Sequence, residues 1–204
     1  MGLRDEKKQA TRTAIADTAL LLFLDRGFER VTVAEVARAA GVSVNTVFNY
    51  FPAKEDLLFD RQAEVVHRLA RAVTRRADGE TVAAAVLRAF LAELDAGEPT
   101  LGLDPGAVRF WSLVQQSPAL QARVRLMHEQ TEEALASALS ETVTADPAIL
   151  RITAAIIAAA DRALHGEIQR LVTLGEDPSR VRGKIRALAK HTYEALDDHL
   201  RPSG

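Results

Sequence analysis

Apolar side chains recur every three or four positions along most of this chain, which is the spacing of helices with one buried face. Over residues 5–25 they include Ile15, Ala19 and Phe23, and the pattern predicts a helix that ends at Gly27. Prolines and glycines divide the second half into further predicted helices, over residues 80–96, 105–116, 118–144, 147–174 and 178–200. Because no long β-branched runs bounded by turn residues occur, the sequence predicts an all-α fold.

Two short helices joined by a tight corner are predicted over residues 32–51. Thr32 and Glu35 have the spacing of a capping box, Gly41 supplies the freedom that a sharp corner needs, and Ser43 can cap the second helix. The second helix exposes hydrogen-bonding groups and no long acids, at Asn45, Thr46, Asn49 and Tyr50. This pattern is typical of a helix-turn-helix whose second helix enters the DNA major groove. Taken alone, it also fits two surface helices of an ordinary all-α domain.

A single connecting helix is predicted over residues 53–76. Pro52 suits the first turn of a helix, and Glu55 and Asp56 follow where acids favour the helix dipole. The sequence thus predicts a helix-turn-helix domain over residues 1–52, this connecting helix, and a helical domain over residues 77–204.

Composition narrows the class of protein. The 204 residues are 48% hydrophobic and include no cysteine, which excludes disulfides and thiolate sites and fits a reducing cytoplasm. Residues 1–76 carry a net charge of +3, with 13 Lys or Arg and 10 Asp or Glu, whereas residues 77–204 carry −5, with 13 and 18. That asymmetry is expected if the N-terminal third meets phosphates, although scattered solvated charge would also produce it. No signal peptide or membrane span is expected.

The flanks of the predicted helix-turn-helix extend the pattern. Over residues 15–58 the chain resembles the TetR family of transcriptional regulators, at Ala19, Phe23, Gly27, Phe28, Thr32, Ala37, Gly41, Val42, Ser43, Thr46, Tyr50, Phe51, Lys54, Glu55 and Leu57. The resemblance implies an N-terminal three-helix helix-turn-helix domain and a C-terminal helical domain for effector binding and dimerisation. It also implies a ligand-responsive regulator, expected to be a repressor, that binds a pseudo-palindromic operator in double-stranded DNA.

The resemblance places a set of side chains at the DNA: Thr32, Ser43, Val44, Asn45, Thr46, Asn49, Tyr50 and Lys54. Thr46, Tyr50 and Lys54 fall where the family contacts mainly the DNA backbone. Val44, Asn45 and Asn49 fall where bases are read; Asn can pair with adenine and Val44 can touch a thymine methyl group. Each has an ordinary alternative: Thr32 only caps, Asn49 is only solvated, or Lys54 pairs with an acid.

One position departs from the family. Phe48 stands where many members carry Tyr, so it cannot donate a hydroxyl to phosphate. Either Phe48 packs inward or Asn49 replaces its backbone contact. A basic N-terminal arm could add sequence-independent contacts through Arg4, Lys7, Lys8 and Arg12; the alternative is a terminus that is only solvated.

A small-molecule effector is expected in the C-terminal half, in a mostly apolar pocket. The predicted ligand-binding residues are Phe90, Phe110, Trp111, Gln115, Met127, Asp161 and His165. Asp161 lies on an apolar helix face, so its carboxylate should be paired, near solvent or facing a cavity. Asp161 and His165, four residues apart, could hold a metal, but a structural pair is favoured. The segments 43–58 and 161–178 also resemble regulators associated with mycofactocin clusters, which respond to acyl-CoA-type ligands, over too little of the chain to fix a ligand.

A homodimer is expected through the last two helices. Their apolar stripes predict a seam that contains Ile152, Ile156, Ala160, Ile185, Leu188 and Thr192. The alternative is that these stripes pack within one chain. No cofactor, metal site or catalytic motif is expected. The rival functions are a helical small-molecule-binding protein or enzyme, and a scaffold for protein partners.

Overall fold

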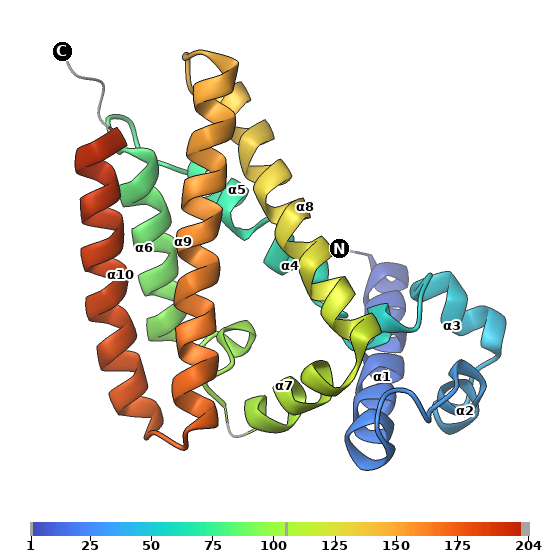
Figure 1. The fold of residues 1–204 in the computed structure, drawn as a ribbon. Coiled ribbons are helices and arrows are strands. Elements are labelled where there is room, and N and C mark those ends of the chain that lie inside the picture. Colours follow the sequence, from blue (N-terminus) through green and yellow to red (C-terminus); the bar gives the residue numbers. More distant parts are fainter. Residues whose placement is uncertain (1, 105, 201–204) are drawn as a thin grey trace. The chain divides into compact units, whose positions relative to one another are not determined.

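The computed structural model describes residues 2–104 and 106–200, apart from the side chains of residues 3, 4, 199 and 200. Within these residues every regular element is a helix, so the predicted all-α class is confirmed (Figure 1). The elements are α1 (Leu3–Arg26), α2 (Val33–Ala39), α3 (Val44–Tyr50), the 3₁₀ helix η1 (Glu55–Leu57), α4 (Gln62–Val66), α5 (Arg68–Thr74), α6 (Val82–Ala96), the 3₁₀ helix η2 (Pro99–Leu101), α7 (Ala107–Gln116), α8 (Pro118–Thr142), α9 (Pro147–Thr173) and α10 (Pro178–Leu200).

The chain forms two compact units. Unit 1 contains Met1–Ala63 and Arg109–Val124, and unit 2 contains Glu64–Val108 and Arg125–Gly204. The predicted boundaries at residues 52 and 76 assign Arg109–Val124 to the C-terminal domain, whereas in the structure this segment belongs to unit 1. The predicted helices of the C-terminal half are present with ends shifted by a few residues; Pro105, where one was expected to start, lies outside the described residues.

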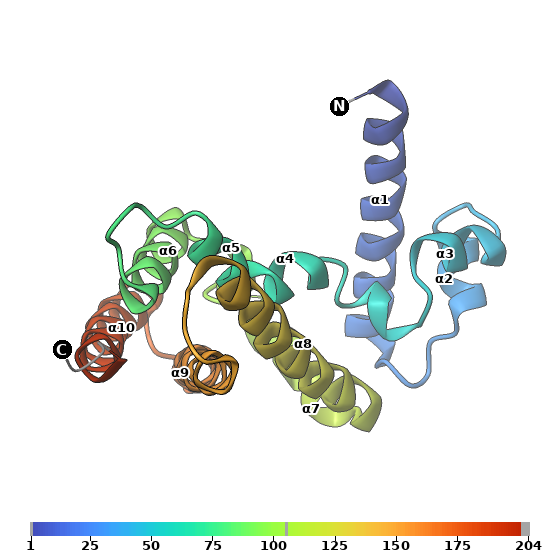
Figure 2. The same cartoon turned by 90° about the horizontal axis from the view of Figure 1, so that it is seen from above.

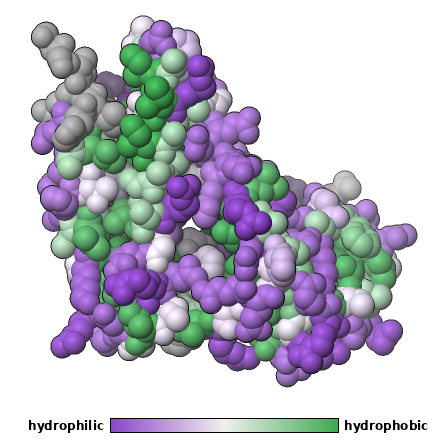
Figure 3. Space-filling model, viewed as in Figure 1, coloured by the Kyte–Doolittle hydropathy of each residue, from purple (hydrophilic) through white to green (hydrophobic). Residues whose placement is uncertain are grey.

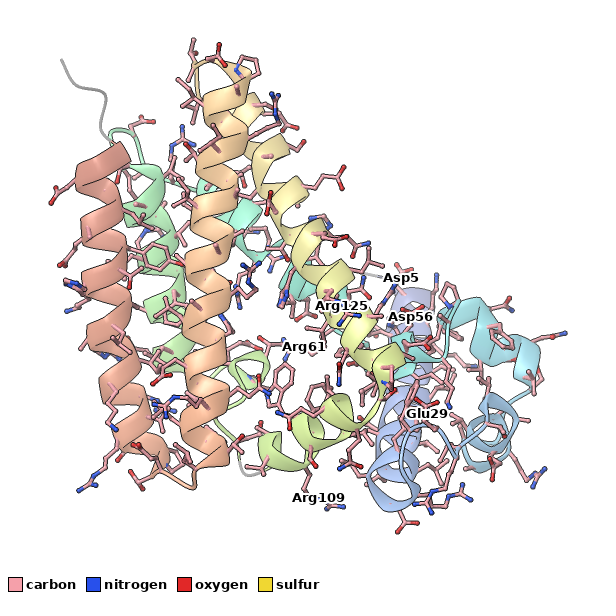
Figure 4. The ribbon with its side chains drawn as sticks, in the orientation of Figure 1. Asp5, Glu29, Asp56, Arg61, Arg109 and Arg125 are labelled. Atoms are coloured by element: carbon pink, nitrogen blue, oxygen red, sulfur yellow. The ribbon has the colours of Figure 1, made fainter. Side chains whose placement is uncertain are left out.

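The second segment of unit 1 is held by side chains from both ends of α7 and the start of α8. Ser117 Oγ donates to Glu29 Oε1 at 2.5 Å, Arg123 forms an ion pair with Asp56, and Arg109 donates to the carbonyl of Leu24 at 3.3 Å. Glu29, Asp56 and Arg109 are labelled in Figure 4. These bonds explain why residues far along the chain pack with the N-terminal helices.

The core of unit 1 fixes the position of α3. Phe23 on α1 and Val47 on α3 are fully buried, and Phe51 directly after α3 is 1% exposed. Arg12 donates to the carbonyls of Tyr50 at 2.7 Å and Asp60 at 3.1 Å, and its guanidinium lies 4.3 Å from the Phe51 ring centroid. Arg12 therefore ties α1 to the end of α3, and is not a free member of the predicted basic arm.

The predicted single helix over residues 53–76 is wrong. The segment forms η1, α4 and α5, with breaks between them. The physical reason is burial: Leu57, Leu58 and Phe59 are consecutive and all buried, which one face of a continuous helix cannot achieve. The backbone N–H of Ala53 is also taken by the Asp56 carboxylate at 3.0 Å.

Unit 2 is built on α6, α9 and α10, with α9 and α10 nearly end-on in Figure 2. Helix α10 packs against α6 and α9, and Val86, Ala154 and Ile157 are at most 1% exposed. Thr81 caps α6 and Asp146 caps α9. Among the residues that the structure describes, no helix is long and apolar enough to cross a membrane.

Candidate nucleic-acid interface and the buried charge cluster

The start of α2 is fixed by the predicted capping box. Thr32 Oγ1 accepts from the N–H of Glu35 at 3.2 Å, and Glu35 Oε2 accepts from the N–H of Thr32 at 2.8 Å. The hydrogen bond from the Thr32 backbone, followed by that from its hydroxyl, lowers the pKa of Glu35. The capping role of Thr32 is confirmed; its DNA contact stays a prediction.

The corner between α2 and α3 also follows the sequence. Gly41 adopts a φ of +69°, in the left-handed region that favours glycine. The N–H of Val42 donates to the carbonyl of Ala37 at 3.0 Å and closes the turn. Ser43 Oγ accepts from the N–H of Thr46 at 3.0 Å and caps α3. Since Val47 is fully buried, the orientation of α3 about its own axis is determined.

The outer face of α3 carries two pairs of side chains. Val44 and Phe48 are 38% and 46% exposed, and Asn45 and Asn49 are also exposed. Phe48 therefore does not pack inward, and the replacement of its phosphate contact by Asn49 stays a prediction. The sequence of α3, Val-Asn-Thr-Val-Phe-Asn-Tyr, contains no charged side chain. Thr46 and Tyr50 are half-buried at its margins.

Lys54 differs from the prediction. It precedes the three-residue η1 rather than lying in the first turn of a long helix. Its ammonium donates to the carbonyl of Phe28 at 2.6 Å and lies 4.2 Å from that ring's centroid. An ammonium has three N–H donors, so Lys54 retains capacity for a phosphate oxygen.

A hollow in unit 1 adjoins the end of α3. It is lined by Asp5, Lys8, Gln9, Arg12, Asn49 and Tyr50. Lys7 and Lys8 on α1 are exposed, whereas the side chain of Arg4 lies outside the described residues. Lys8, which lines this hollow with Asn49 and Tyr50, and the exposed Lys7 remain candidates for sequence-independent phosphate contacts.

Unit 2 contains a charge cluster in which the buried Arg68 and Asp161 contact the half-buried Glu93 and His165. Arg68 on α5 donates to Asp161 Oδ2 on α9 at 2.5 Å, and its Nε lies 3.7 Å from Glu93 Oε2 on α6. Arg68 Nη1 lies 2.9 Å from His165 Nε2, and His165 Nδ1 lies 2.8 Å from the carbonyl oxygen of Asp161. The expectation that Asp161 is paired is thus correct, with Arg68 as the main partner.

Burial controls protonation in the cluster. It raises the pKa of Glu93, although Arg68 opposes the shift. Burial, and then the charge of Arg68, lowers the pKa of His165, so its imidazole is held neutral. Burial also raises the pKa of Tyr193, whose hydroxyl lacks a hydrogen-bond partner, as does Asp161 Oδ1. Among the described residues, no group of three or more His, Cys, Asp or Glu is arranged to hold a metal.

The predicted effector residues fall into two sets. Phe90, Met127, Asp161 and His165 belong to unit 2, and the Phe90 ring centroid lies 5.7 Å from that of His165. The other set belongs to unit 1 and comprises Phe110, Trp111 and Gln115. Within it the Phe110 and Trp111 rings are 5.3 Å apart, and Gln115 is exposed. Sequence reasoning missed Arg68 and Glu93, because no local pattern marks residues whose partners lie up to 97 positions away.

The predicted dimer seam needs one correction. Ile185 is fully buried in the core of its own chain, because α10 turns this side toward α6 and α9. Ile152, Ile156 and Leu188 are 60%, 39% and 42% exposed, and Ile149, outside the predicted seam, is 58% exposed. Ala160 and Thr192 are half-buried. Figure 3 shows the corresponding hydrophobic strip over the upper part of α9. This strip is called the α9 strip below and comprises Ile149, Ile152 and Ile156.

Comparison with known proteins finds HTH-type transcriptional regulators among the relatives of this chain. The family described as "Bacterial regulatory proteins, tetR family" matches residues 15–60. The HTH-type transcriptional regulator TcmR of Streptomyces glaucescens is 33% identical over 140 residues, which are 66% of this chain and 61% of TcmR. The chain thus spans about three fifths of the curated relatives it matches.

Two solved structures show the same fold. One is NalD, the secondary repressor of the MexAB-OprM multidrug efflux pump in Pseudomonas aeruginosa, with a TM-score of 0.53 and 21% identity over 95% of this chain and 96% of that one. The other is a SmeT–triclosan complex, with a TM-score of 0.57 and 18% identity over 89% and 90%.

Proposed function

Since the chain belongs to the TetR family of bacterial regulatory proteins, we propose that it is a transcriptional repressor. It binds a pseudo-palindromic operator in double-stranded DNA as a homodimer and releases it when a small, largely apolar effector binds. It is not an enzyme, and it acts in the cytoplasm.

One observation carries the proposal most directly: α3 is a capped, rigidly seated helix with an uncharged, hydrogen-bonding outer face. Ser43 fixes its start, Val47 anchors its inner side, and Asn45 and Asn49 point to solvent. A helix that carries amides outward can bond base edges, while nearby lysines and Thr32 meet phosphates. The positive net charge of residues 1–76 supports the same assignment.

The α9 strip supports the homodimer. Three isoleucines at 39–60% exposure form one stripe along α9, and Leu188 on α10 is 42% exposed. A second copy of the same surface would cover these side chains in a two-fold, four-helix arrangement. Two copies would present two α3 helices, which suits half-sites one DNA turn apart, roughly 34–36 Å.

Effector control requires two states with different affinity for DNA. A ligand shifts their populations only through its preference for one state, and a change from 1:99 to 99:1 needs about 5.5 kcal/mol of such preference. The predicted effector residues stay a proposal, in which Asp161 Oδ1 offers an acceptor that none of the residues described by the structure occupies. The likeness of the fold to a protein solved with triclosan supports an apolar effector.

The experiment is a mobility-shift assay on duplexes that tile the region upstream of the chain's own gene. We expect one fragment that contains an inverted repeat to shift, with two protomers per duplex by sedimentation. The double variant Asn45→Ala/Asn49→Ala should lose the preference for that fragment yet keep its helical content. If no fragment shifts in preference to random duplex at moderate salt, the proposal fails.

A further inference from the structure

We propose that α3 reads A·T base pairs, with Val44 and Phe48 against thymine methyl groups and Asn45 and Asn49 bonded to adenine. The inference rests on the proposed DNA-binding function and adds to it the base pairs recognised. It also gives Phe48 a role in base reading instead of the phosphate contact that a tyrosine hydroxyl would make.

The geometry groups the four side chains into two rows. Val44 and Phe48 are four residues apart, as are Asn45 and Asn49, so each pair lies on one face of α3 about one turn apart, or roughly 5.4 Å. Both apolar side chains are more than one third exposed, although Val47 between them is fully buried. The outer face thus has an apolar row beside an amide row.

The chemistry of the rows matches a single kind of base pair. In the major groove, adenine presents the N7 acceptor and the N6 donor that an Asn amide bonds in bidentate fashion, and thymine presents its methyl group. An A·T pair therefore satisfies both rows at once. A G·C pair offers no methyl group, and its guanine is read most often by Arg or Lys. Helix α3 has neither residue, so its outer face lacks the usual guanine reader.

Phe48 is the informative residue. Its ring is 46% exposed although the unit 1 core holds Phe23, Phe28 and Phe51 at no more than 3%. A phenyl ring offers no donor to phosphate, so its favourable contact at the groove is with apolar atoms. The thymine methyl group is the apolar group that the major groove presents. Helix α3 has no charged residue beside Phe48, so no ion pair within this helix competes with the contact.

The test begins with a pool of synthetic duplexes randomised over roughly three helical turns, from which the wild-type chain selects its own site. We expect adjacent A·T pairs at the centre of each half-site. Each thymine of the selected duplex is then replaced by uracil, which removes only the methyl group. Uracil at a contacted position should weaken binding roughly fourfold, the value of one buried methyl-sized group. Replacing adenine by 7-deazaadenine should weaken binding by tenfold or more through loss of the N7 acceptor.

Matched variants identify the residue responsible. Phe48→Ala should bind the thymine and uracil duplexes equally at one position of each half-site, whereas Phe48→Tyr, which keeps the ring, should retain the fourfold difference. Leu21→Ala removes an apolar side chain that is 69% exposed on α1 and should behave as wild type. Because Phe48 and Leu21 are exposed, these variants should fold.

The outcomes separate the two proposals. If the pool yields no selected site, the proposed DNA-binding function fails. If a site is selected but G·C pairs occupy the half-site centres, the reading of A·T pairs is wrong. If uracil has no effect, or the same effect in Phe48→Ala as in wild type, Phe48 does not contact a thymine methyl group.

Discussion

Removing the charge of Asp161 should destabilise unit 2 by about 3 kcal/mol. The Arg68 and Asp161 side chains are 9% and 8% exposed and 2.5 Å apart, and breaking a buried ion pair typically costs about 3–5 kcal/mol. Asp161→Asn leaves the volume unchanged and leaves Arg68 without its main counter-charge. Glu93 Oε2, 3.7 Å from Arg68 Nε, remains as a second acidic partner of the guanidinium, which places the expected cost at the lower end.

The assay is urea unfolding followed by the helical circular dichroism signal, with thermal unfolding in parallel. A loss of about 3 kcal/mol is a large part of an ordinary domain stability of roughly 5–15 kcal/mol. For a domain of this size it lowers the midpoint temperature by roughly 10 °C. The control is Glu167→Gln, also on α9, which removes an exposed pair with Arg170 and should cost at most about 1 kcal/mol.

A double variant tests the physical reasoning. Arg68→Met/Asp161→Leu replaces both charges by apolar groups and should recover most of the stability that either single change loses. The reasoning is refuted if Asp161→Asn costs no more than Glu167→Gln. It is equally refuted if the effects of the two changes at positions 68 and 161 simply add.

Three further outcomes are expected. Gly41→Ala forces a side chain into φ +69° and should lose about 1–2 kcal/mol in thermal unfolding; an unchanged midpoint would show that the corner relaxes. The wild type should lose stability as the pH falls from 7.5 to 5.5, because the unfolded chain binds a proton at His165 that the folded imidazole, with its lowered pKa, does not. His165→Gln should reduce this loss. Urea midpoints that change equally with pH in the variant and the wild type would contradict it. Ile152→Glu should give monomers in sedimentation velocity with helicity retained, and a stable dimer would remove the α9 strip from the interface.

The helix-turn-helix was predictable because its determinants are local. A threonine with glutamate three residues later, a glycine at the corner and a serine before the next helix specify caps and a turn without information from the rest of the chain. Thr32, Gly41 and Ser43 occupy the predicted conformations for that reason. The helices from α6 to α10 were predictable for the same reason, since prolines and glycines mark their ends.

The remaining features depend on contacts far apart in the sequence. Residues 57–59 do not form the predicted continuous helix, because all three are buried. The spacing of apolar residues along the sequence does not reveal that burial. From the sequence alone Arg68 cannot be told from a solvated arginine on a helix, because its partner Asp161 lies 93 positions later. Ile185 and Leu188 belong to the same apolar stripe, yet only packing against α6 and α9 shows that the first is core and the second is exposed.

Helix α3 is proposed to recognise a particular DNA sequence. The most direct measurement is the ratio of the dissociation constants for a random duplex and for the selected inverted repeat, of equal length and at one salt concentration near 0.15 M. Specific recognition typically gives a ratio of roughly 10³ or more. We predict a ratio in that range for the wild type and one near unity for Asn45→Ala/Asn49→Ala. A wild-type ratio near unity would show that α3 does not recognise a particular sequence.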